Sequence, residues 1–589
     1  MREISTPPLV DLGGYRNVTD LLVRRVAAAP DHVAFDVRDG QGSWTPVTTA
    51  DFAATVRGVA KGLLATGVAP GDAIAIMAPT RYEWAVADLA VWFAGGVVVP
   101  VYDSSSPAQV AEIVRDARVR LAFAGGERSR TALVAALDDA SLGVISVEDG
   151  LAPLAALGAD VSDAQLEAAR LHAAPDSPAT IVYTSGTSGA AKGAVLTHEN
   201  FLGQVLNIAA AYSDIVRKDG NTVIFLPLAH VLARGLQLIC LASGMRIAHL
   251  SEPSEVVESL AVLQPTFLVV VPRILEKIAA AAGAKAAEKR LGAVWAAAER
   301  TAIAEGARAE RVDDGEPAAA PRTLGVRRAI FDALFYRRIR ALMGGRIRYV
   351  LSGGATLPSR LSLLFRGMGV PVIEGYGLTE TTAPLTGNLP GRTRSGTVGI
   401  PLPGSTVRIS DEGEVLAKGV GVFSGDRDPQ ADAEAFVDGF FRTGDLGRLD
   451  ERGRLVLEGR VKDVVTTSHG KTVAPARWES AIEEHPLISS AVTVGEGRPY
   501  LTALLVLDPD ATAAAHGGLP VALDDAALRA TAQSAVDRAN TLVATSEQVR
   551  RFALVFADAD DREVVTPTLK IRRRELLHRE SATIDALYG

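Results

Sequence analysis

The residue types most able to do chemistry gather in residues 183–193, YTSGTSGAAKG. An apolar run at residues 179–183 leads into them and predicts a buried strand. Glycines let backbone N–H groups approach a ligand closely, and the hydroxyls and the lysine add donors, so this loop could hold a polyphosphate. It is not a Walker A loop, because Ala191 precedes the lysine and Gly193 follows it. On composition alone, an ordinary flexible turn is the alternative.

The length and composition of the chain limit the classes of protein to which such a loop could belong. A chain of 589 residues exceeds one ordinary core and predicts two or more domains. Its 48% hydrophobic and 22% charged residues are typical of a soluble globular protein. The net charge of −8 argues against a general nucleic-acid binder. The single cysteine, Cys240, excludes an internal disulfide and a cysteine-based zinc site, and it fits a reducing compartment.

One apolar segment, residues 84–102, requires a membrane test. Asp88, the pair Gly95–Gly96 and Pro100 interrupt it, so we predict a helix to about residue 93 followed by a buried strand at 97–99. The first residues of the sequence carry no apolar signal region. These observations predict a soluble, cytoplasmic protein.

The elements that must position the loop alternate between strand and helix patterns. Residues 33–37 and 73–77 predict strands, residues 49–66 and 82–94 predict helices, and the serines at 104–106 with Pro107 predict another helix start. Such alternation implies βαβ units and sheets with helices on their faces. Further strands are expected near 245–249 and 267–271. Residues 274–343 predict two or more surface helices, whose basic face could contact anionic lipid but is more often simply solvated.

Two more stretches, residues 348–355 and 372–381, run from a strand pattern into a glycine turn. Ligands of open α/β sheets lie beyond the carboxyl ends of strands, so we expect these turns and the first loop to face one pocket. Residues 396–457 predict a small β-rich subdomain. The composition changes at 459–463, and the remainder is long enough for an α+β domain.

Seven motifs in order resemble the adenylate-forming superfamily of acyl-CoA synthetases, peptide-synthetase adenylation domains and luciferases. They are YTSGTSGAAKG (183–193), LPLAH (226–230), SGGA (352–355), EGYGLTE (374–380), TGD (443–445), GRVKD (459–463) and PTLKIRR (567–573). Residues 99–110, 226–234 and 271–277, with the helical insertion that follows, look most like long-chain fatty acyl-CoA synthetases. No insertion of the kind found in fatty acyl-AMP ligases follows Arg460, which favours a thioester product.

The resemblance implies a fold and a reaction. An N-terminal domain, residues 1–460, would hold layered α/β subdomains, a β-rich subdomain and a helical insertion at about 277–343, and residues 461–589 would form a small, mobile α+β domain. A fatty acid would attack ATP to give an acyl-adenylate and pyrophosphate, and CoA would then displace AMP. The alternatives are a ligase for a medium-chain or aromatic acid, a phosphate-loop NTPase or kinase, and a non-catalytic carrier.

The resemblance also implies the nucleotide site. Residues expected to hold the β- and γ-phosphates of ATP are Thr184, Ser185, Gly186, Thr187, Ser188, Gly189 and Lys192. Gly353, Gly354 and Ala355 are expected to form the wall against adenine, and Tyr376 would stack on the ring. Glu374, Gly375 and Gly377 are expected among the residues that bind ATP or AMP. Thr379 would contact phosphate, and Glu380 with Thr187 would hold Mg²⁺. Asp445 would accept hydrogen bonds from the ribose hydroxyls, with Arg460 behind it. Taken singly, a turn aspartate, a core tyrosine and a helix-start Thr–Glu pair are the ordinary alternatives.

Catalysis is expected from Lys570, which would bridge the acid and the α-phosphate. Without the resemblance, Lys570 would be taken as a solvated lysine in a basic run. His230 would orient the substrate carboxylate, or else be a structural histidine. Lys462 matches the hinge of the swivelling domain, and Gly470 with Lys471 would approach CoA. The expected partners are small molecules and no nucleic acid; oligomeric state and a peripheral contact with the inner face of a membrane are left open.

Overall fold

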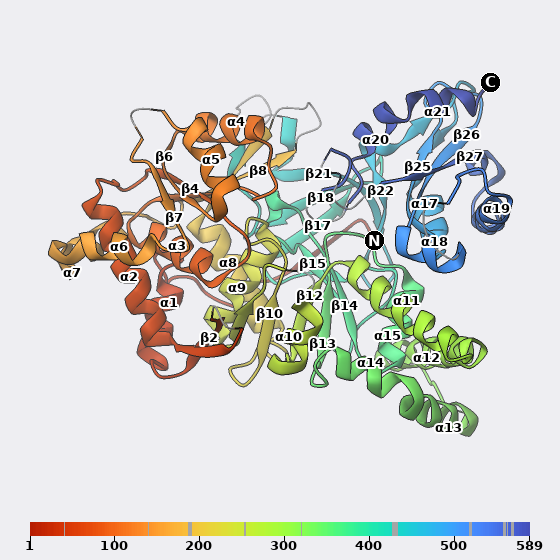
Figure 1. The fold of residues 1–589 in the computed structure, drawn as a ribbon, viewed down its shortest axis with the longest axis horizontal. Coiled ribbons are helices and arrows are strands. Elements are labelled where there is room, and N and C mark those ends of the chain that lie inside the picture. The colour runs from red at the N-terminus through yellow and green to blue at the C-terminus, as the bar shows by residue number, and fades with distance from the viewer. Residues whose placement is uncertain are drawn as a thin grey trace.

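The computed structural model describes residues 1–39, 42–138, 141–185, 191–252, 255–319, 321–426, 434–516, 521–557, 561, 563–566 and 570–589. Three sheets with covering helices form a large N-terminal domain, and a smaller domain follows at the C-terminus, at the upper right of Figure 1. The predicted α/β class with a small α+β C-terminal domain is therefore confirmed.

The first sheet carries the strand that leads into the glycine-rich loop. Its strands, in spatial order, are β19 (Gly425–Asp426), β9 (Ala191–Thr197), β8 (Pro178–Ser185), β5 (Val97–Pro100), β4 (Ala73–Met77), β6 (Val119–Ala124) and β7 (Val144–Ser146). The helices of this region are α2 (Thr49–Ala65), α3 (Tyr82–Phe93), α4 (Pro107–Ala117), α5 (Gly126–Ala136), α6 (Leu151–Leu157) and α7 (Asp163–Arg170). β4 pairs in parallel with β5 and β6, and its five residues are all buried, as a sheet covered on both faces requires.

The second sheet is the scaffold of the pocket. In spatial order it contains β16 (Ile400–Pro401), β15 (Thr386–Gly387), β14 (Val372–Tyr376), β13 (Tyr349–Ser352), β12 (Phe267–Val270), β10 (Asn221–Ile224), β11 (Arg246–His249), β2 (Val33–Arg38) and β3 (Trp44–Thr48). The helices of this region are α1 (Asp20–Ala28), α8 (His198–Ala211), α9 (Val231–Ser243), α10 (Val256–Leu263) and α15 (Ser359–Gly367). Because β10, β12, β13 and β14 run parallel, their carboxyl ends meet at one edge.

The β-rich subdomain is a third sheet. It contains β1 (Glu3–Thr6), β17 (Ser405–Ile409), β18 (Glu414–Gly419), β21 (Phe440–Leu449) and β20 (Phe436–Val437), with β22 (Leu455–Arg460) paired to β21. The prediction of a β-rich region at 396–457 is confirmed. β1 was not predicted, and it joins this sheet from the opposite end of the sequence by pairing antiparallel with β17.

The C-terminal domain is built on a three-stranded sheet of β25 (Ile488–Val494), β26 (Leu501–Leu507) and β27 (Val549–Phe556). A hairpin of β23 (Val465–Thr466) and β24 (Thr472–Val473) precedes it. Its helices are α17 (Ala476–Glu483), α18 (Pro509–His516), α19 (Ala526–Asn540), α20 (Arg573–Arg579) and α21 (Ser581–Ala586). Arg273 of the N-terminal domain forms an ion pair with Asp508, which fixes α18 above the insertion in Figure 1.

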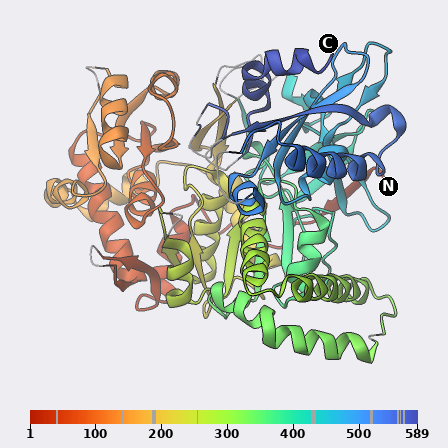
Figure 2. The same cartoon turned by 45° about the vertical axis from the view of Figure 1, so that its right-hand side comes forward.

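The predicted helical insertion contains α11 (Pro272–Glu288), α12 (Gly292–Asp313), α13 (Arg322–Phe331), a π-helical turn η3 (Asp332–Tyr336) and α14 (Arg337–Leu342). α12 packs closely against α15: Gly306 and Gly367 each lie where a Cβ would overlap the facing backbone. Figure 2 shows α13 running along the lower edge of the molecule beneath α12. The expectation of surface helices joined by a loop is confirmed.

Several local predictions can be checked residue by residue. Ser106 caps the helix that begins at Pro107, because its hydroxyl accepts from the N–H of Gln109 at 3.3 Å in a full capping box. Residues 84–102 form the rest of α3 and then β5 rather than one long helix. Within the described ranges, every helix is too short or too polar to cross a bilayer.

Candidate active site

The candidate site begins where four parallel strands of the second sheet end. The segment after β10 leads to His230, β12 ends before Val271, β13 runs into Gly353–Gly354, and β14 runs into Gly377. Gly354 has φ +81, a left-handed conformation that favours glycine. The predicted meeting of the 348–355 and 372–381 turns at one edge is confirmed, since Ser352 and Glu374 are register partners.

His230 stands at the amino end of α9. Its Nδ1 accepts a hydrogen bond from the N–H of Leu232 at 3.1 Å, so the histidine caps the helix. With Nδ1 occupied as an acceptor, the neutral ring carries its proton on Nε2. Burial, and then the charge of Lys570, lower the pKa of His230 to about 4. His230 is therefore a neutral donor near pH 7, suited to hold a carboxylate oxygen.

A fully buried ion pair fixes the helix that carries His230. Arg234, one turn further along α9, donates to both carboxylate oxygens of Asp88, at 3.0 and 2.5 Å. It also donates to the hydroxyl of Thr180 on β8 at 2.7 Å. The same strand leads into the glycine-rich loop, so one arginine connects α9 with the base of that loop. Such a charge is tolerated in a core only because its hydrogen bonds are satisfied.

Lys570 reaches this edge of the sheet from the C-terminal domain. Its N–H donates to Thr566 Oγ1 at 2.9 Å, and its carbonyl accepts from the Thr566 N–H at 2.8 Å, which fixes its backbone beside Thr566. Although the residue keeps solvent exposure, desolvation by surrounding protein and the charge of Arg460 lower the pKa of Lys570, while Asp445 opposes the shift. Lys570, His230 and Gly354 line the same small cavity.

Asp445 on β21 is the centre of a second polar group. Its carboxylate accepts from the Tyr376 hydroxyl at 2.7 Å and pairs with the Arg460 Nε at 2.8 Å. Burial raises the pKa of Asp445, while Arg460, Tyr376, Lys570 and Lys462 oppose the shift. The structure thus brings Asp445, Tyr376, Arg460 and Lys570 together from four separate segments. We call this group, with His230 and Gly354, the polar mouth.

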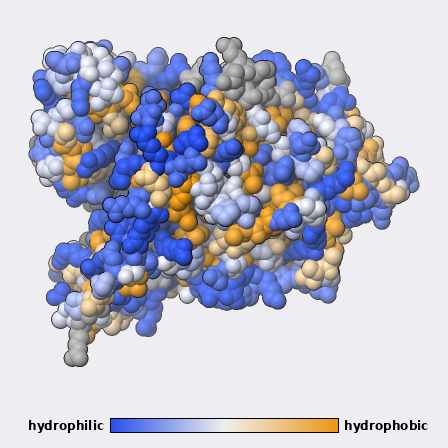
Figure 3. All heavy atoms as spheres, turned by 180° about the vertical axis from the view of Figure 1, so that it is seen from behind, coloured by the Kyte–Doolittle hydropathy of each residue, from blue (hydrophilic) through white to orange (hydrophobic). Residues whose placement is uncertain are grey.

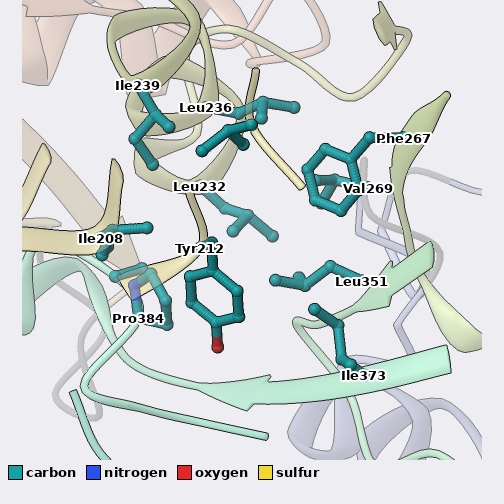
Figure 4. A pocket seen from close by; sticks show the side chains of 12 residues that line it. Ile208, Tyr212, Leu232, Leu236, Ile239, Phe267, Val269, Leu351, Ile373 and Pro384 are labelled. Atoms are coloured by element: carbon teal, nitrogen blue, oxygen red, sulfur yellow. The ribbon is translucent and has the colours of Figure 1, made fainter. Parts of the chain in front are cut away.

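An apolar cavity lies behind the mouth. It is lined by Ile208, Tyr212, Val216, Leu232, Leu236, Ile239, Phe267, Val269, Leu351, Ile373, Ala383 and Pro384. Figure 4 shows Leu232, Leu236 and Ile239 projecting into it from α9, opposite Leu351 and Ile373 of the sheet. The Tyr212 hydroxyl points away from these α9 side chains and donates to the Asn388 carbonyl at 3.0 Å. The lining therefore offers an incoming ligand almost purely apolar contact.

Leu232 is the wall that the two spaces share. It lines the apolar cavity and also the cavity that is lined by His230 and Lys570. A Cβ at Gly353 would lie 3.4 Å from the Leu232 Cδ2, so the leucine packs against the glycine turn. A ligand with a carboxylate at one end and a long apolar tail matches these two spaces in series.

Comparison with known proteins agrees with this geometry. The AMP-binding enzyme family matches residues 22–425, and the AMP-binding enzyme C-terminal domain matches residues 462–589. The chain belongs to the AMP-binding enzyme family. This membership confirms the predicted resemblance to adenylate-forming acyl-CoA ligases, and it is incompatible with the alternative of a phosphate-loop kinase.

Curated relatives cover the full length. The chain is 38% identical to the long-chain-fatty-acid–CoA ligase FadD15 of Mycobacterium bovis over 605 residues, which span all of both chains. It is 27% identical to the long-chain-fatty-acid–CoA ligase 6 of Mus musculus, with 87% of this chain and 78% of that protein covered.

Solved structures show the same fold. ATP-bound MatB from Rhodopseudomonas palustris has a TM-score of 0.71 at 24% identity, covering 96% of this chain and 99% of that one. The o-succinylbenzoate CoA synthetase MenE from Bacillus subtilis, in complex with the acyl-adenylate OSB-AMP, has a TM-score of 0.68 at 21% identity, covering 94% and 97%.

For this family the glycine-rich loop is the expected phosphate site, and the structure describes only the strands that flank it. Gly186, Thr187, Ser188 and Gly189 lie outside the described residues, as do the side chains of Thr184, Ser185 and Lys192. β8 and β9 flank the loop as an antiparallel pair, with Thr184 opposite Lys192. The predicted strand before the loop is confirmed, whereas the returning strand β9 was not predicted.

Thr379 and Glu380 open a short 3₁₀ turn, η4 (Thr379–Thr381), that packs against β9. They therefore lie beside the strand that leaves the loop. Mg²⁺ that is held mainly by phosphate oxygens needs only one or two protein carboxylates, so the single half-buried Glu380 fits this ion. Thr187, the other expected contact, falls outside the described residues.

The remaining predicted residues divide between the mouth and other places. Gly354 and Ala355 are exposed in the turn after β13, and Gly375 lies beside Tyr376 in β14. Glu374 is buried, and burial followed by the charge of Glu310 raises its pKa well above the ordinary value. Its backbone carbonyl accepts from the N–H of Asn388 at 2.8 Å. Its part in nucleotide binding stays a prediction.

The predicted hinge and CoA residues lie in the C-terminal segment. Lys462 is exposed in η5 (Val461–Asp463), directly after Arg460. Gly470, with φ +73, and Lys471 are exposed in the turn of the β23–β24 hairpin, and neither lines the cavity that holds Lys570. Their roles stay predictions.

The lining of the apolar cavity was missed by sequence analysis. A usable signal was present, because Leu232, Leu236 and Ile239 follow the i, i+4, i+7 spacing of one helix face. Ile208, Tyr212 and Val216 follow a similar spacing of i, i+4 and i+8, from α8 into the turn after it. Periodicity predicts a buried face, but it does not tell a face packed against protein from one that lines a cavity.

Proposed function

We propose that this protein is an ATP-dependent long-chain fatty acid–CoA ligase that releases AMP and pyrophosphate. The observation that carries the proposal is the series of two spaces: Lys570 and His230 at a polar mouth, and an apolar cavity beyond their shared wall, Leu232. The names of the relatives with full-length similarity support the same substrate class.

The first half-reaction uses the mouth. A carboxylate oxygen of the acid attacks the α-phosphorus of ATP, the bond to the β-phosphate oxygen breaks, and pyrophosphate leaves with that electron pair. The Lys570 ammonium attracts both the carboxylate and the α-phosphate, and the neutral His230 donates from Nε2 to the acid. Glu380 would hold Mg²⁺ together with the phosphates, and the ion would supply neutralising charge. Catalysis here is positioning and electrostatic stabilisation.

Asp445 holds the nucleoside in this proposal. Its carboxylate already accepts from Tyr376 and Arg460, which orient it and oppose the rise in its pKa that burial causes. The ribose hydroxyls would donate to its remaining acceptor positions. Tyr376 is fixed through its hydroxyl, and its ring would lie against adenine. Gly353 and Gly354 have no side chains and would leave room for the adenine beside it.

The second half-reaction requires a different arrangement. The CoA sulfur attacks the acyl carbonyl carbon, AMP leaves with the electrons of the acyl–phosphate bond, and the thiol proton passes to solvent. Lys570 occupies the mouth, while Gly470 and Lys471 lie in an exposed turn of the same domain. We propose that rotation about Lys462 withdraws Lys570 and brings this turn to the mouth, as domain movements do in two-step enzymes.

The lining favours a long aliphatic tail. Twelve side chains surround the cavity, and the one polar group among them, the Tyr212 hydroxyl, is already hydrogen-bonded. A hydroxylated or charged acid would find no partner there and would lose its hydrogen bonds to water. Medium-chain and aromatic acids are the alternatives, because either would fill part of the same space.

A product assay tests the proposal. The protein is incubated with ATP, Mg²⁺, CoA and acids from acetate to oleate, and pyrophosphate, AMP and thioester are measured. Equal amounts of the three products, with the highest kcat/KM for long chains, are expected. Pyrophosphate without thioester would indicate an adenylating enzyme with another acceptor. A maximum of kcat/KM at benzoate or octanoate would indicate an aromatic or medium-chain acid as the substrate. ADP, or no turnover with any acid, would contradict the proposal.

A further inference from the structure

The outer side of α13, η3 and α14 carries an apolar stripe that the fold does not cover. Val326, Ile330, Leu334 and Leu342 follow a spacing of four or eight residues and are 61%, 52%, 41% and 55% exposed. We call these four side chains the α13–α14 stripe. Of the seventeen large apolar side chains that are exposed among the described residues, four lie in this stripe, and single exposed side chains elsewhere need no explanation.

The inner side of the same segment already serves the core. Tyr336 and Ile339 are buried, and the Tyr336 hydroxyl donates to the Ala298 carbonyl of α12 at 2.6 Å. The Phe335 ring packs edge-on against Trp295 with centroids 5.4 Å apart. These contacts fix α13–α14 to α12 without any help from the stripe. The outward stripe is therefore available to something outside the chain.

Arginines surround the stripe. Residues 321–348 contain eight arginines and a single carboxylate, Asp332, in a chain whose net charge is −8. Asp332 is neutralised by Arg340 at 2.6 Å. Arg327, Arg337 and Arg338 are exposed beside the stripe. The segment is thus strongly positive on an otherwise acidic protein, so its charge favours an anionic partner.

The combination selects one kind of partner. A nucleic acid would satisfy the arginines but would leave the apolar stripe in contact with phosphates and water. A bilayer with anionic headgroups satisfies both, because apolar side chains enter the acyl region and arginines pair with phosphate in the headgroup layer. We propose that the α13–α14 stripe and its arginines dock this protein on an anionic membrane surface.

The position of the segment allows such docking. α13 projects along one edge of the molecule, at the lower right of Figure 1 and along the lower edge of Figure 2. Seen from behind, the same projection lies at the lower left of Figure 3, where apolar patches stand among hydrophilic residues. A flat surface can therefore approach the stripe. This inference goes beyond the proposed function and stands whether or not the acid is a fatty acid.

Vesicle co-sedimentation of the full chain tests the proposal. Wild-type protein should bind vesicles of equal parts phosphatidylcholine and phosphatidylglycerol, should bind pure phosphatidylcholine far less, and should dissociate as salt is raised. Changing Val326→Ser, Ile330→Ser and Leu334→Ser together should lower the partition coefficient about tenfold or more. The partition coefficient should also fall about fivefold for each arginine that is replaced singly, in Arg327→Gln, Arg337→Gln and Arg338→Gln.

A matched control is available on another surface. Val134→Ser with Leu157→Ser removes two apolar side chains that are 57% and 61% exposed on α5 and α6, and it should leave vesicle binding unchanged. If a stripe variant fails to fold, hydrogen exchange of the wild type gives a second measurement. Anionic vesicles should protect residues 326–342 and should not protect α5 or α6.

Three results would overturn the proposal. The first is that the protein does not bind anionic vesicles at low salt. The second is that the stripe variant binds them as well as the wild type does. The third is that the wild type forms a dimer without lipid and the stripe variant does not, which would assign this face to a second copy. The docking and the proposed function fail separately. Thioester formation from a soluble acid should be equal in wild type and stripe variant, and vesicle binding without turnover of any acid would refute the ligase alone.

Discussion

The polar mouth and the apolar cavity share one wall, Leu232, but they are built differently. The mouth is assembled from strand residues, from turns that follow strands and from Lys570 of the C-terminal domain, so a few side chains carry its charge. The cavity is lined by the faces of α8, α9 and three strands, and no single side chain dominates it. The difference separates reactivity, which depends on position and charge, from the choice of acid, which depends on shape.

The largest effect is expected in the mouth. Lys570→Ala removes the cation that we propose to bridge the carboxylate and the α-phosphate, and we expect adenylation to fall about a thousandfold or more. Pyrophosphate release with ATP and acid measures this step. Thioester formation from supplied acyl-adenylate and CoA should stay within a factor of a few, because the proposed rotation withdraws Lys570 in that step. Equal loss of both steps would refute the division of labour between the two arrangements.

The cavity should respond with selectivity rather than with rate. Ile239 lies seven residues beyond Leu232 on α9, about 10 Å further from the mouth. Ile239→Trp should therefore exclude the end of long chains and lower the ratio of kcat/KM for long against medium acids about tenfold or more.

A mouth variant provides the contrast for Ile239→Trp. His230→Ala should lower kcat/KM for all acids by a common factor, because the proposed contact of His230 with the substrate is the carboxylate that every acid shares. Competition assays with pairs of acids measure both ratios. A changed chain-length ratio in His230→Ala, or an unchanged ratio in a folded Ile239→Trp, would show that the two spaces are not independent.

The pH profile sharpens the comparison further. Lys570 acts when protonated, and its pKa is lowered from 10.5, so adenylation should fall as pH rises through that lowered pKa. His230, with a pKa of about 4, stays neutral down to that pH, so no acid limb is expected near the 6.5 of an ordinary histidine. Thioester formation from acyl-adenylate should lack the alkaline limb. Finding that limb in both steps would contradict its assignment to Lys570.

The smallest effect is expected at the contact between the domains. Arg273→Ala removes the ion pair with Asp508, and partly exposed pairs contribute about 0–1 kcal/mol. Adenylation should fall two- to fivefold, roughly what such an energy allows, with the thioester step unchanged or faster. Arg448→Ala, which breaks an exposed pair with Glu458 inside the β-rich sheet, is the control. Equal effects of both variants would remove any special role from Arg273.

Much of the framework could be predicted from the sequence because its signals are local. β4 was predicted with its bounds, and the end of α2 differed by one residue, since periodicity and capping residues mark such elements directly. The polar mouth was predicted for a different reason. Its residues sit in short motifs with unusual glycine and polar content, which a resemblance can transfer position by position.

What could not be predicted depends on distant contacts. Nothing near Arg234 in the sequence shows that Asp88 and Thr180 will surround it, because the three come from α9, α3 and β8. β9 carries the end of the glycine-rich loop and is a strand only because β8 pairs with it. The apolar lining is invisible for the same reason, since helix periodicity is identical for a packed face and for a cavity wall.

The pairing of β1 with β17 has a consequence for how the chain reaches this fold. Ser5 and Thr406 lie 401 positions apart and join their hydroxyls at 2.8 Å. During synthesis the β1 segment emerges long before β17 and β18 and can pair only after they have left the ribosome. Contacts this distant in sequence are slow to form. The third sheet should therefore be the last part of the N-terminal domain to close, and pulse-labelled hydrogen exchange should find β1 and β17 protected later than β4 and β5.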